Sequence, residues 1–320
     1  MSQGKLVRLN EDKWKAFELK LKDIDKVPAD ELAYMYVHLT EDLAYSRGKF
    51  PNSNLTIYLN ELTLKVHNAI FRNKPEEKSR FIKFWSQEVP RELKSSYSYI
   101  AYSFLIFTVG ILIGVLSAAN DETFIRLILS DAYVDKTLQN ISSGDPMAIY
   151  KDASEGNMFF LITINNIRVA LMAFAMGILF SIGTGYILFQ NGMMLGVFHY
   201  LFFQNNVFDE TILTIWIHGT LEISAIIIAG AAGLIMGNGF LFPGTYTRMH
   251  SFQIAAKKGL KIVISLVPFF IAAGFLESFI TRQTHWPLHV KIFIIMISLF
   301  ITILYLFILP NLNTYERAKN

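Results

Sequence analysis

After residue 96, long runs of apolar residues alternate with short polar stretches. The runs lie at residues 97–119, 158–204, 211–237, 262–281 and 291–310. A membrane-crossing helix needs about 20 predominantly apolar residues, so four of these runs each predict one crossing. The run at 158–204 is too long for one crossing, and its interruptions at 183–185 and 190–192 predict two helices with a tight turn or a broken segment between them. The chain is therefore expected to be an all-α polytopic membrane helix bundle with about six transmembrane helices.

The first 96 residues follow a different pattern. Apolar side chains recur there at three- and four-residue spacing in two stretches, which predicts a hairpin of two amphipathic helices. The two stripes are Leu32, Met35, Tyr36, Leu39 and Leu43, and Leu55, Tyr58, Leu59, Leu62, Val66 and Ile70. Residues 81–91 then mix aromatic and basic side chains, which predicts an elbow lying in the membrane interface.

These patterns divide the chain into three parts. A helical domain with its elbow occupies residues 1–96, and a transmembrane bundle occupies 97–312. The bundle includes an external loop at 120–157 with one or two short helices. A tail at 313–320 carries Arg317 and Lys319.

The run at 211–237 has two unlike halves. Its first half carries His218 and Glu222, which are four residues apart and so share one helix face. Its second half is rich in small residues, and Gly233 and Gly237 form a Gly-xxx-Gly step that lets another helix approach closely. Ionisable residues inside a membrane are costly and are commonly functional, so we interpret this helix as the one around which the others are arranged.

Two more glycine pairs have the same spacing. Gly110 and Gly114 lie in the run at 97–119, and Gly192 and Gly196 lie in the run at 158–204. We expect all three pairs to mark close helix packing.

Composition agrees with a membrane protein and excludes several other classes. The chain is 52% hydrophobic and only 17% charged, whereas soluble domains have about 25% charged residues. It has no Cys, so it has neither a disulfide nor a thiolate metal site or nucleophile. Its basic residues flank apolar runs, which predicts lipid contact and no nucleic-acid binding.

The distribution of Lys and Arg predicts the orientation. Residues 1–96 hold 17 of the 29 basic residues, the segment 240–261 reads as a basic loop, and the tail is basic. The segment 120–157 has seven acidic residues against three basic ones. Because basic segments stay in the cytoplasm, six crossings put both termini inside and 120–157 outside, in a multi-pass protein of the bacterial inner membrane.

This topology gathers polar residues in the outer half of the bundle. Helix rise places residues from four spans at similar depth: Asn165, Asn166, Arg168, His199, His218, Glu222, Glu277 and Arg282. Arg168 is the strong base at the depth of Glu222, so we expect it to lie close to that carboxylate. The cluster is either a structural network of paired groups or a working site for a ligand, proton or metal.

Motifs for known chemistry are sparse. His218 and Glu222 can both ligate one metal ion from one helix face, with Glu277 or His199 completing the set, but the His-Glu-x-x-His pattern of zinc proteases is missing. Neither a G-x-S-x-G elbow nor a phosphate-binding loop occurs, so we expect no ATPase activity and no cofactor, and the sequence leans against an enzyme.

The order and spacing of several short motifs resemble the stage II sporulation protein M family of bacterial inner-membrane proteins. The motifs are Phe50-Pro51, Leu59-Asn60-Glu61-Leu62, His67, Asn165-Asn166, Gly177, Asn191-Gly192, Gly196, His218-Gly219, Glu222, Glu277 and Thr281-Arg282. The resemblance implies an all-α polytopic protein without an established catalytic activity. In spore formers a family member acts in engulfment within a membrane complex that includes peptidoglycan hydrolases.

Three functional hypotheses follow. The first is a scaffold or accessory subunit of a membrane complex linked to the cell envelope, with other membrane or envelope proteins, or further copies of the chain, as partners. The second is a transporter or permease-like component that uses an outward-facing polar cavity. The third is an intramembrane metal-dependent hydrolase.

The predicted topology can be tested directly because the chain has no native Cys. A Ser143→Cys variant should react with a membrane-impermeant thiol reagent added to the outside of spheroplasts, since residues 120–157 are expected to be external. Reaction from the cytoplasmic side alone would overturn the assignment.

Overall fold

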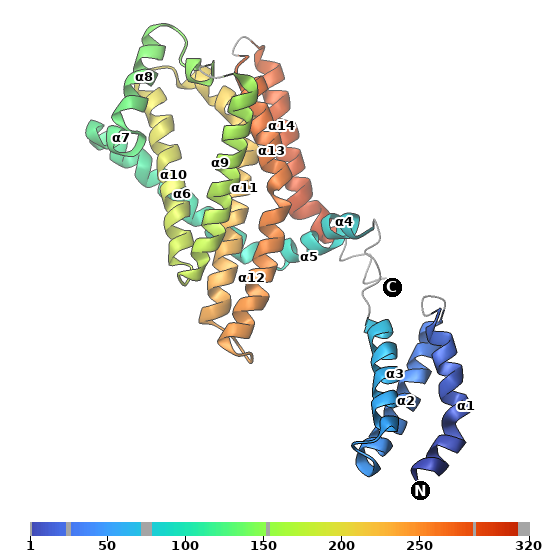
Figure 1. Cartoon of the computed structure of the whole chain (residues 1–320). Helices are drawn as coiled ribbons and strands as arrows, with labels where there is room; N and C mark the ends of the chain where they lie inside the picture. The colour runs from blue at the N-terminus through green and yellow to red at the C-terminus, as the bar shows by residue number, and fades with distance from the viewer. Residues whose placement is uncertain (1, 24–26, 72–78, 152–153, 284–285, 313–320) are drawn as a thin grey trace. The chain divides into compact units, whose positions relative to one another are not determined.

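The computed structural model of the chain describes residues 2–23, 27–71, 79–151, 154–283 and 286–312 (Figure 1). All regular structure in these ranges is helical, which confirms the all-α prediction. The chain divides into two compact units, Met1–Arg80 and Phe81–Asn320. The predicted tail with Arg317 and Lys319 lies outside the described residues.

The first unit contains three helices, α1 (Gln3–Leu21), α2 (Ala29–Lys49) and α3 (Asn54–Phe71). The stripes of α2 and α3 share one core, in which Leu39 and Leu59 are fully buried. Trp14 and Phe17 of α1 complete that core, and Trp14 Nε1 donates a hydrogen bond to Asp42 Oδ2 at 2.8 Å. The predicted pair of striped helices is present as α2 and α3, and α1, which precedes the break at Val27-Pro28, covers apolar surface that these two helices leave open.

The elbow consists of α4 (Ser79–Lys83), the π-helical turn η2 (Phe84–Glu88) and α5 (Val89–Lys94). Val89 and Leu93 are fully buried in the core of the second unit. The elbow therefore packs with the membrane helices, and the compact first unit ends at Arg80, before the expected boundary at residue 96.

Five helical segments in the described part of the chain are long and apolar enough to cross a membrane. The first four are α6 (Tyr97–Asn120), α9 together with η4 (Glu155–Ile178), α11 (Phe208–Leu241), and α12 together with α13 and η5 (Arg248–Thr281). The fifth segment is Leu288–Leu312, which contains α14 (Leu288–Ile303) and η6 (Leu304–Ile308). α10 (Ile182–Gln204) has 23 residues and lies among them, but Gln190, Asn191 and His199 make it less apolar. Between α6 and α9 lie α7 (Glu122–Leu129), α8 (Asp131–Ser142) and η3 (Ala148–Lys151).

The turn between α9 (Glu155–Ala175) and α10 comes earlier than expected. It lies at residues 179–181, where Phe180 and Ser181 adopt positive φ angles of 52° and 67°. Non-glycine residues take this left-handed conformation at some cost. The Ser181 hydroxyl offsets part of that cost by donating to the Leu234 carbonyl at 3.2 Å. α10 then runs unbroken through Asn191 and Gly192.

The segment after α11 also differs from expectation. Residues 240–261 were expected to form a basic loop, but α12 (Arg248–Ser265) already begins at Arg248. It continues into α13 (Val267–Phe275) and η5 (Leu276–Thr281). Lys258 donates to Ser95 Oγ at 2.8 Å, and Lys261 pairs with Glu88 at 2.7 Å. These lysines therefore lie on a helix and tie it to the elbow.

α11 is the central helix of the second unit (Figure 1). In its most apolar stretch 83% of the residues are buried, compared with 22% for α6, α9 and α14. The neighbours of α11 are α6, α9, α10, α12, α13 and α14. A helix that is buried all round belongs in the middle of a bundle, which agrees with the interpretation of this run as the organising helix.

α6 and α10 pack backbone against backbone. A Cβ atom added at Gly192 or Gly196 would collide with the carbonyl oxygens of Phe107 and Ile111 on α6. The relation is reciprocal, because Gly110 and Gly114 face the backbone of Phe189 and Met193 on α10. The four glycines thus allow an approach that any side chain would prevent.

The C-terminal half of α11 packs in the same way. A Cβ at Gly233 would collide with the Ala173 carbonyl and the Thr184 side chain. A Cβ at Gly237 would collide with Ser181 and would lie 2.7 Å from the Gly177 carbonyl oxygen. Small residues therefore fix α11 against the turn between α9 and α10.

We expect Gly192→Leu to destabilise the bundle, because the new side chain meets backbone that cannot rotate away. Overpacking typically costs about 1–3 kcal/mol, and backbone contact places this case at the upper end. Thermal unfolding of the detergent-solubilised protein measures the effect. Gly185→Leu on the same helix is the control, since nothing lies within 4 Å of a Cβ added there. Equal unfolding temperatures for the two variants would contradict the packing argument.

Candidate functional site

Three of the predicted polar residues come together at one point in the bundle. His218 and Glu222 lie on consecutive turns of α11, and Glu277 lies in η5. One ligand atom from each of the three side chains lies within 4.8 Å of the other two. We call His218, Glu222 and Glu277 the α11–η5 triad. α-Helical spacing explains the first pair, and the packing of α13 and η5 on α11 supplies the third residue.

His218 is held from both sides. Its Nδ1 forms a 3.0 Å hydrogen bond with Thr281 Oγ1, and its Nε2 lies 3.8 Å from Glu277 Oε2. Thr281 and Glu277 are four residues apart in η5, so both reach the same imidazole. The side chains of His218 and Glu277 are only 6% and 14% exposed. The ring is therefore fixed in orientation, with Nε2 directed at the carboxylate.

Asn166 of α9 adds a polar group next to the triad. Its side chain is 6% exposed and its amide faces the Glu222 carboxyl. The amide lies outside good hydrogen-bond geometry, so Nδ2 is buried without a partner. A buried amide donor without an acceptor is unfavourable by roughly 1–3 kcal/mol.

Arg168 does not join the cluster, in contrast to the sequence-based expectation. It is exposed on α9, as is Asn165, and no ion pair among the described residues involves it. The reason is helix phase, since two residues turn an α-helix by about 200° and so place Arg168 opposite Asn166. Within the part of the chain that the structure describes, His218 is thus the one basic side chain within ion-pair distance of the two carboxylates of the triad.

His199 also lies apart from the triad. Trp216 Nε1 donates to His199 Nε2 at 3.3 Å, and His199 Nδ1 donates to the Leu195 carbonyl at 2.8 Å. Both ring nitrogens are thereby used in a neutral imidazole. Arg282 is half-buried directly after η5.

A cavity of about 330 Å³ adjoins the triad, which forms part of its wall. The rest of the wall is mainly apolar and includes Leu129 of α7, Phe198 of α10 and Gly219 of α11. One water molecule needs roughly 10–15 Å³ of such space, so the cavity can hold solvent or a small ligand. This cavity is the candidate functional site.

Tyr133 of α8 brings a phenol into the same cavity. Burial raises the pKa of Tyr133 to about 12, with a smaller contribution from the charge of Glu277 and an opposing hydrogen bond with Thr137. The hydroxyl is therefore protonated at physiological pH and available as a donor. Tyr133 was not predicted from the sequence, because it lies in the segment expected to be an external loop. Thr281 was not predicted as a partner of His218, although its position four residues after Glu277 is a signal that both side chains lie on one side of the helix.

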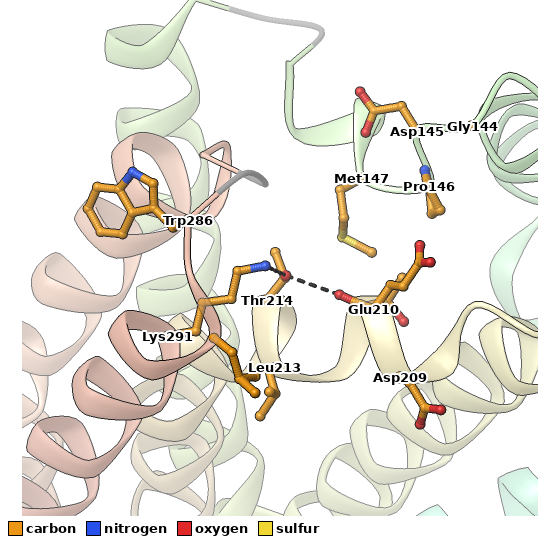
Figure 2. Close-up of a pocket in the computed structure, with 12 residues that line it drawn as sticks. Gly144, Asp145, Pro146, Met147, Asp209, Glu210, Leu213, Thr214, Trp286 and Lys291 are labelled. Atoms are coloured by element: carbon orange, nitrogen blue, oxygen red, sulfur yellow. Dashed lines mark hydrogen bonds between the residues drawn. The ribbon is translucent and has the colours of Figure 1, made fainter.

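A second cavity of about 500 Å³ lies where α11 and α14 begin (Figure 2). Lys291 Nζ donates to Thr214 Oγ1 at 2.9 Å, and Thr214 Oγ1 donates to the Glu210 carbonyl at 3.3 Å. Asp209 and the Glu210 carboxylate also line it (Figure 2). Because Lys291 and Thr214 are already hydrogen-bonded, this cavity is a weaker candidate than the one at the triad.

Comparison with known families identifies the membrane unit. A family model described as Stage II sporulation protein M matches residues 103–282, more than half of the chain. The chain belongs to the stage II sporulation protein M family. A second model, described as a domain of unknown function (DUF8413), matches residues 4–72. No curated protein and no solved structure matches the chain.

The stage II sporulation protein M match begins in α6 and ends directly after η5. It therefore contains the whole triad, Asn166 and Thr281. The cavity at the triad belongs to the part of the chain that the family shares, whereas the three-helix first unit falls under the separate second match.

The cavity generates a test by cysteine accessibility. A Cβ at Gly219 meets only the Ile223 side chain at 3.7 Å, so Gly219→Cys fits without displacing backbone. We expect this cysteine to react with a hydrophilic thiol reagent, since thiolate formation needs water. Ala225→Cys on the same helix is the control, because Ala225 is fully buried away from the cavity and should stay unreactive. An unreactive Gly219→Cys would mean that the cavity is dry.

Proposed function

We propose that this family member is a scaffold or accessory subunit of a complex in the bacterial inner membrane, and that it binds a partner helix through the exposed face of α9. The observation that carries the proposal is Arg168. It is exposed on a segment that is long and apolar enough to cross the membrane.

The position of Arg168 makes exposure to lipid unfavourable. It lies roughly 20 Å along the helix from Glu155 and about 15 Å from Ile178, near the middle of the span. An Arg at the centre of a membrane helix costs about 2.5–3.5 kcal/mol on insertion scales, and snorkelling of its long side chain lowers this cost without removing it. A partner protein that supplies a hydrogen-bond acceptor for the Arg168 guanidinium removes the remaining free-energy cost.

The surroundings of Arg168 form a continuous helix face. Ile164 and Asn165 stand four and three residues before it, Leu161 stands seven residues before it, and Met172 follows four residues later. Leu161 and Ile164 are 68% and 63% exposed, and Asn165 is exposed as well. This α9 face combines apolar area, an amide and a guanidinium, which suits a helix that offers a carboxylate.

The occupant we favour is a membrane helix of another protein with an Asp or Glu at the depth of Arg168. A second copy of the chain fits less well. Within the described spans, the carboxylates at middle depth are Glu222 and Glu277, and both are held inside their own bundle. Charge complementarity therefore points to a different chain.

Packing of the bundle favours a scaffold over a permease. Alternating access requires one group of helices to rock against another. The contacts between α6 and α10, and between α11 and the turn at 179–181, are made by backbone atoms and small side chains. Such contacts hold helices in one register. With both termini in the cytoplasm, the three-helix first unit would offer a second binding platform inside the cell.

Arg168→Met tests the proposal, since it removes the charge and keeps a long side chain. We expect wild-type protein extracted in a mild detergent from its native membrane to migrate as a complex larger than the chain itself. The variant should migrate as the isolated chain with an unchanged unfolding temperature, because Arg168 has no partner in the described bundle. Arg168→Lys should retain part of the complex.

A photo-crosslinking residue at Ile164 separates a specific partner from bulk lipid. It should yield one protein adduct that disappears in the Arg168→Met background. The matched control is the same residue at Phe293 of α14, which is 64% exposed and should give no such adduct. A complex of the same size in wild type and Arg168→Met would overturn the proposal.

A further inference from the structure

We propose that the α11–η5 triad binds one divalent transition-metal ion, for which Zn²⁺ is the probe, with an open coordination position toward the cavity. The proposal rests on residues other than those of the α9 face and does not depend on the partner proposed there.

The separation of the ligand atoms suits such an ion. His218 Nε2 and Glu277 Oε2 are 3.8 Å apart. Zn²⁺ binds imidazole nitrogen and carboxylate oxygen at about 2.0–2.2 Å, so at the tetrahedral angle two ligand atoms lie about 3.3–3.6 Å apart, slightly closer than this pair. One ligand atom from each residue of the triad lies within 4.8 Å of the others, so inward shifts of roughly 1 Å or less would bring the set to binding distance.

Charge supports a divalent cation at this place. Two carboxylates meet inside the bundle, and no Lys or Arg belongs to the described residues that line the cavity. A carboxylate buried without compensation is strongly unfavourable. One divalent cation neutralises both carboxylates while the histidine stays neutral, which is the form that ligates metals.

The surroundings of the triad resemble a second coordination shell. Metal-ligating histidines engage their other ring nitrogen in a hydrogen bond that fixes the ring, and Thr281 Oγ1 forms that bond with His218 Nδ1. Asn166 is a further indication of a ligand, because its buried Nδ2 is directed at the Glu222 carboxyl in poor hydrogen-bond geometry. A water molecule on the metal, or a Glu222 carboxylate turned by the metal, supplies the acceptor.

The donor set and the cavity narrow the type of site. An imidazole with two carboxylates suits Zn²⁺, Mn²⁺ or Fe²⁺ better than Ca²⁺ or Mg²⁺, which prefer oxygen ligands throughout. Three protein ligands leave at least one coordination position, as in zinc sites that bind water or substrate. In this structure that position is adjacent to the cavity of about 330 Å³, so the additional ligand is water or an oxygen atom of a small molecule.

The test uses the full chain without an affinity tag, purified in detergent and stripped with a chelator. We expect Zn²⁺ titration followed by calorimetry and elemental analysis to give one ion per chain. Co²⁺ as a substitute should develop the absorption of a low-coordinate nitrogen and oxygen site. His218→Ala, Glu222→Gln and Glu277→Gln should each lower the affinity by at least about 100-fold.

Two further variants keep the test decisive if a ligand variant fails to fold. Thr281→Val keeps the shape of the side chain and removes the hydrogen bond to His218, so it should weaken Zn²⁺ binding about 10- to 100-fold, as expected for a second-shell partner. His199→Ala removes a half-buried histidine outside the triad and should leave stoichiometry and affinity unchanged.

Several results would overturn the proposal. One is a wild-type chain that binds no Zn²⁺, and another is equal affinity in wild type and Thr281→Val. A third is a Glu222→Gln, Glu277→Gln double variant that unfolds at a higher temperature than wild type with and without added Zn²⁺. That result would mean that the carboxyl groups are neutralised by protons.

Discussion

Direct contact between helix backbones is the constraint on which the rest of the membrane unit depends. Lipid tails are as apolar as a Leu side chain, so burial from water cannot hold helices together within a bilayer. Close packing must do so, and α11 meets its neighbours through Gly233 and Gly237, while Gly192 and Gly196 of α10 meet α6. This packing holds α9, α10 and η5 around α11 closely enough for single side chains from each to meet.

Much of this fold could be predicted from the sequence because the bilayer restricts what an apolar run can become. The organising role of α11 and the positions of its glycines followed from composition and spacing alone. The turn at 179–181 could not be located, because Phe180 and Ser181 lack the Gly or Pro signal of a turn and take positive φ angles only in their tertiary setting. The early start of α12 was not predicted, because its lysines indicated a solvent-exposed loop, whereas Lys258 and Lys261 contact the elbow.

The residues of the candidate site could be predicted only in part, since His218, Glu222 and Glu277 meet but Asn165, Arg168 and His199 lie elsewhere. The pairing of His218 with Glu222 could be predicted from the helical period alone. Whether Asn166 or Arg168 faces this pair depends on how α9 is rotated about its axis, which the sequence does not give. The depth of a residue in the membrane gives its position along the helix axis but not the side of the helix on which its side chain lies. Thr281 and Tyr133 entered the site through η5 and α8, two elements whose local geometry a hydropathy pattern does not encode.

The uneven distribution of small residues along α11 has a mechanical consequence. Half of the helix is clamped by backbone contacts, while the half that carries His218 borders a cavity. α10 is held to α6 beside the cavity through Gly192 and Gly196, so the softer motion at the cavity is that of α8 and η5 against α11, while the clamped half of α11 stays still. Small molecules can then exchange with the cavity through thermal breathing of one end, without a change of register between helices.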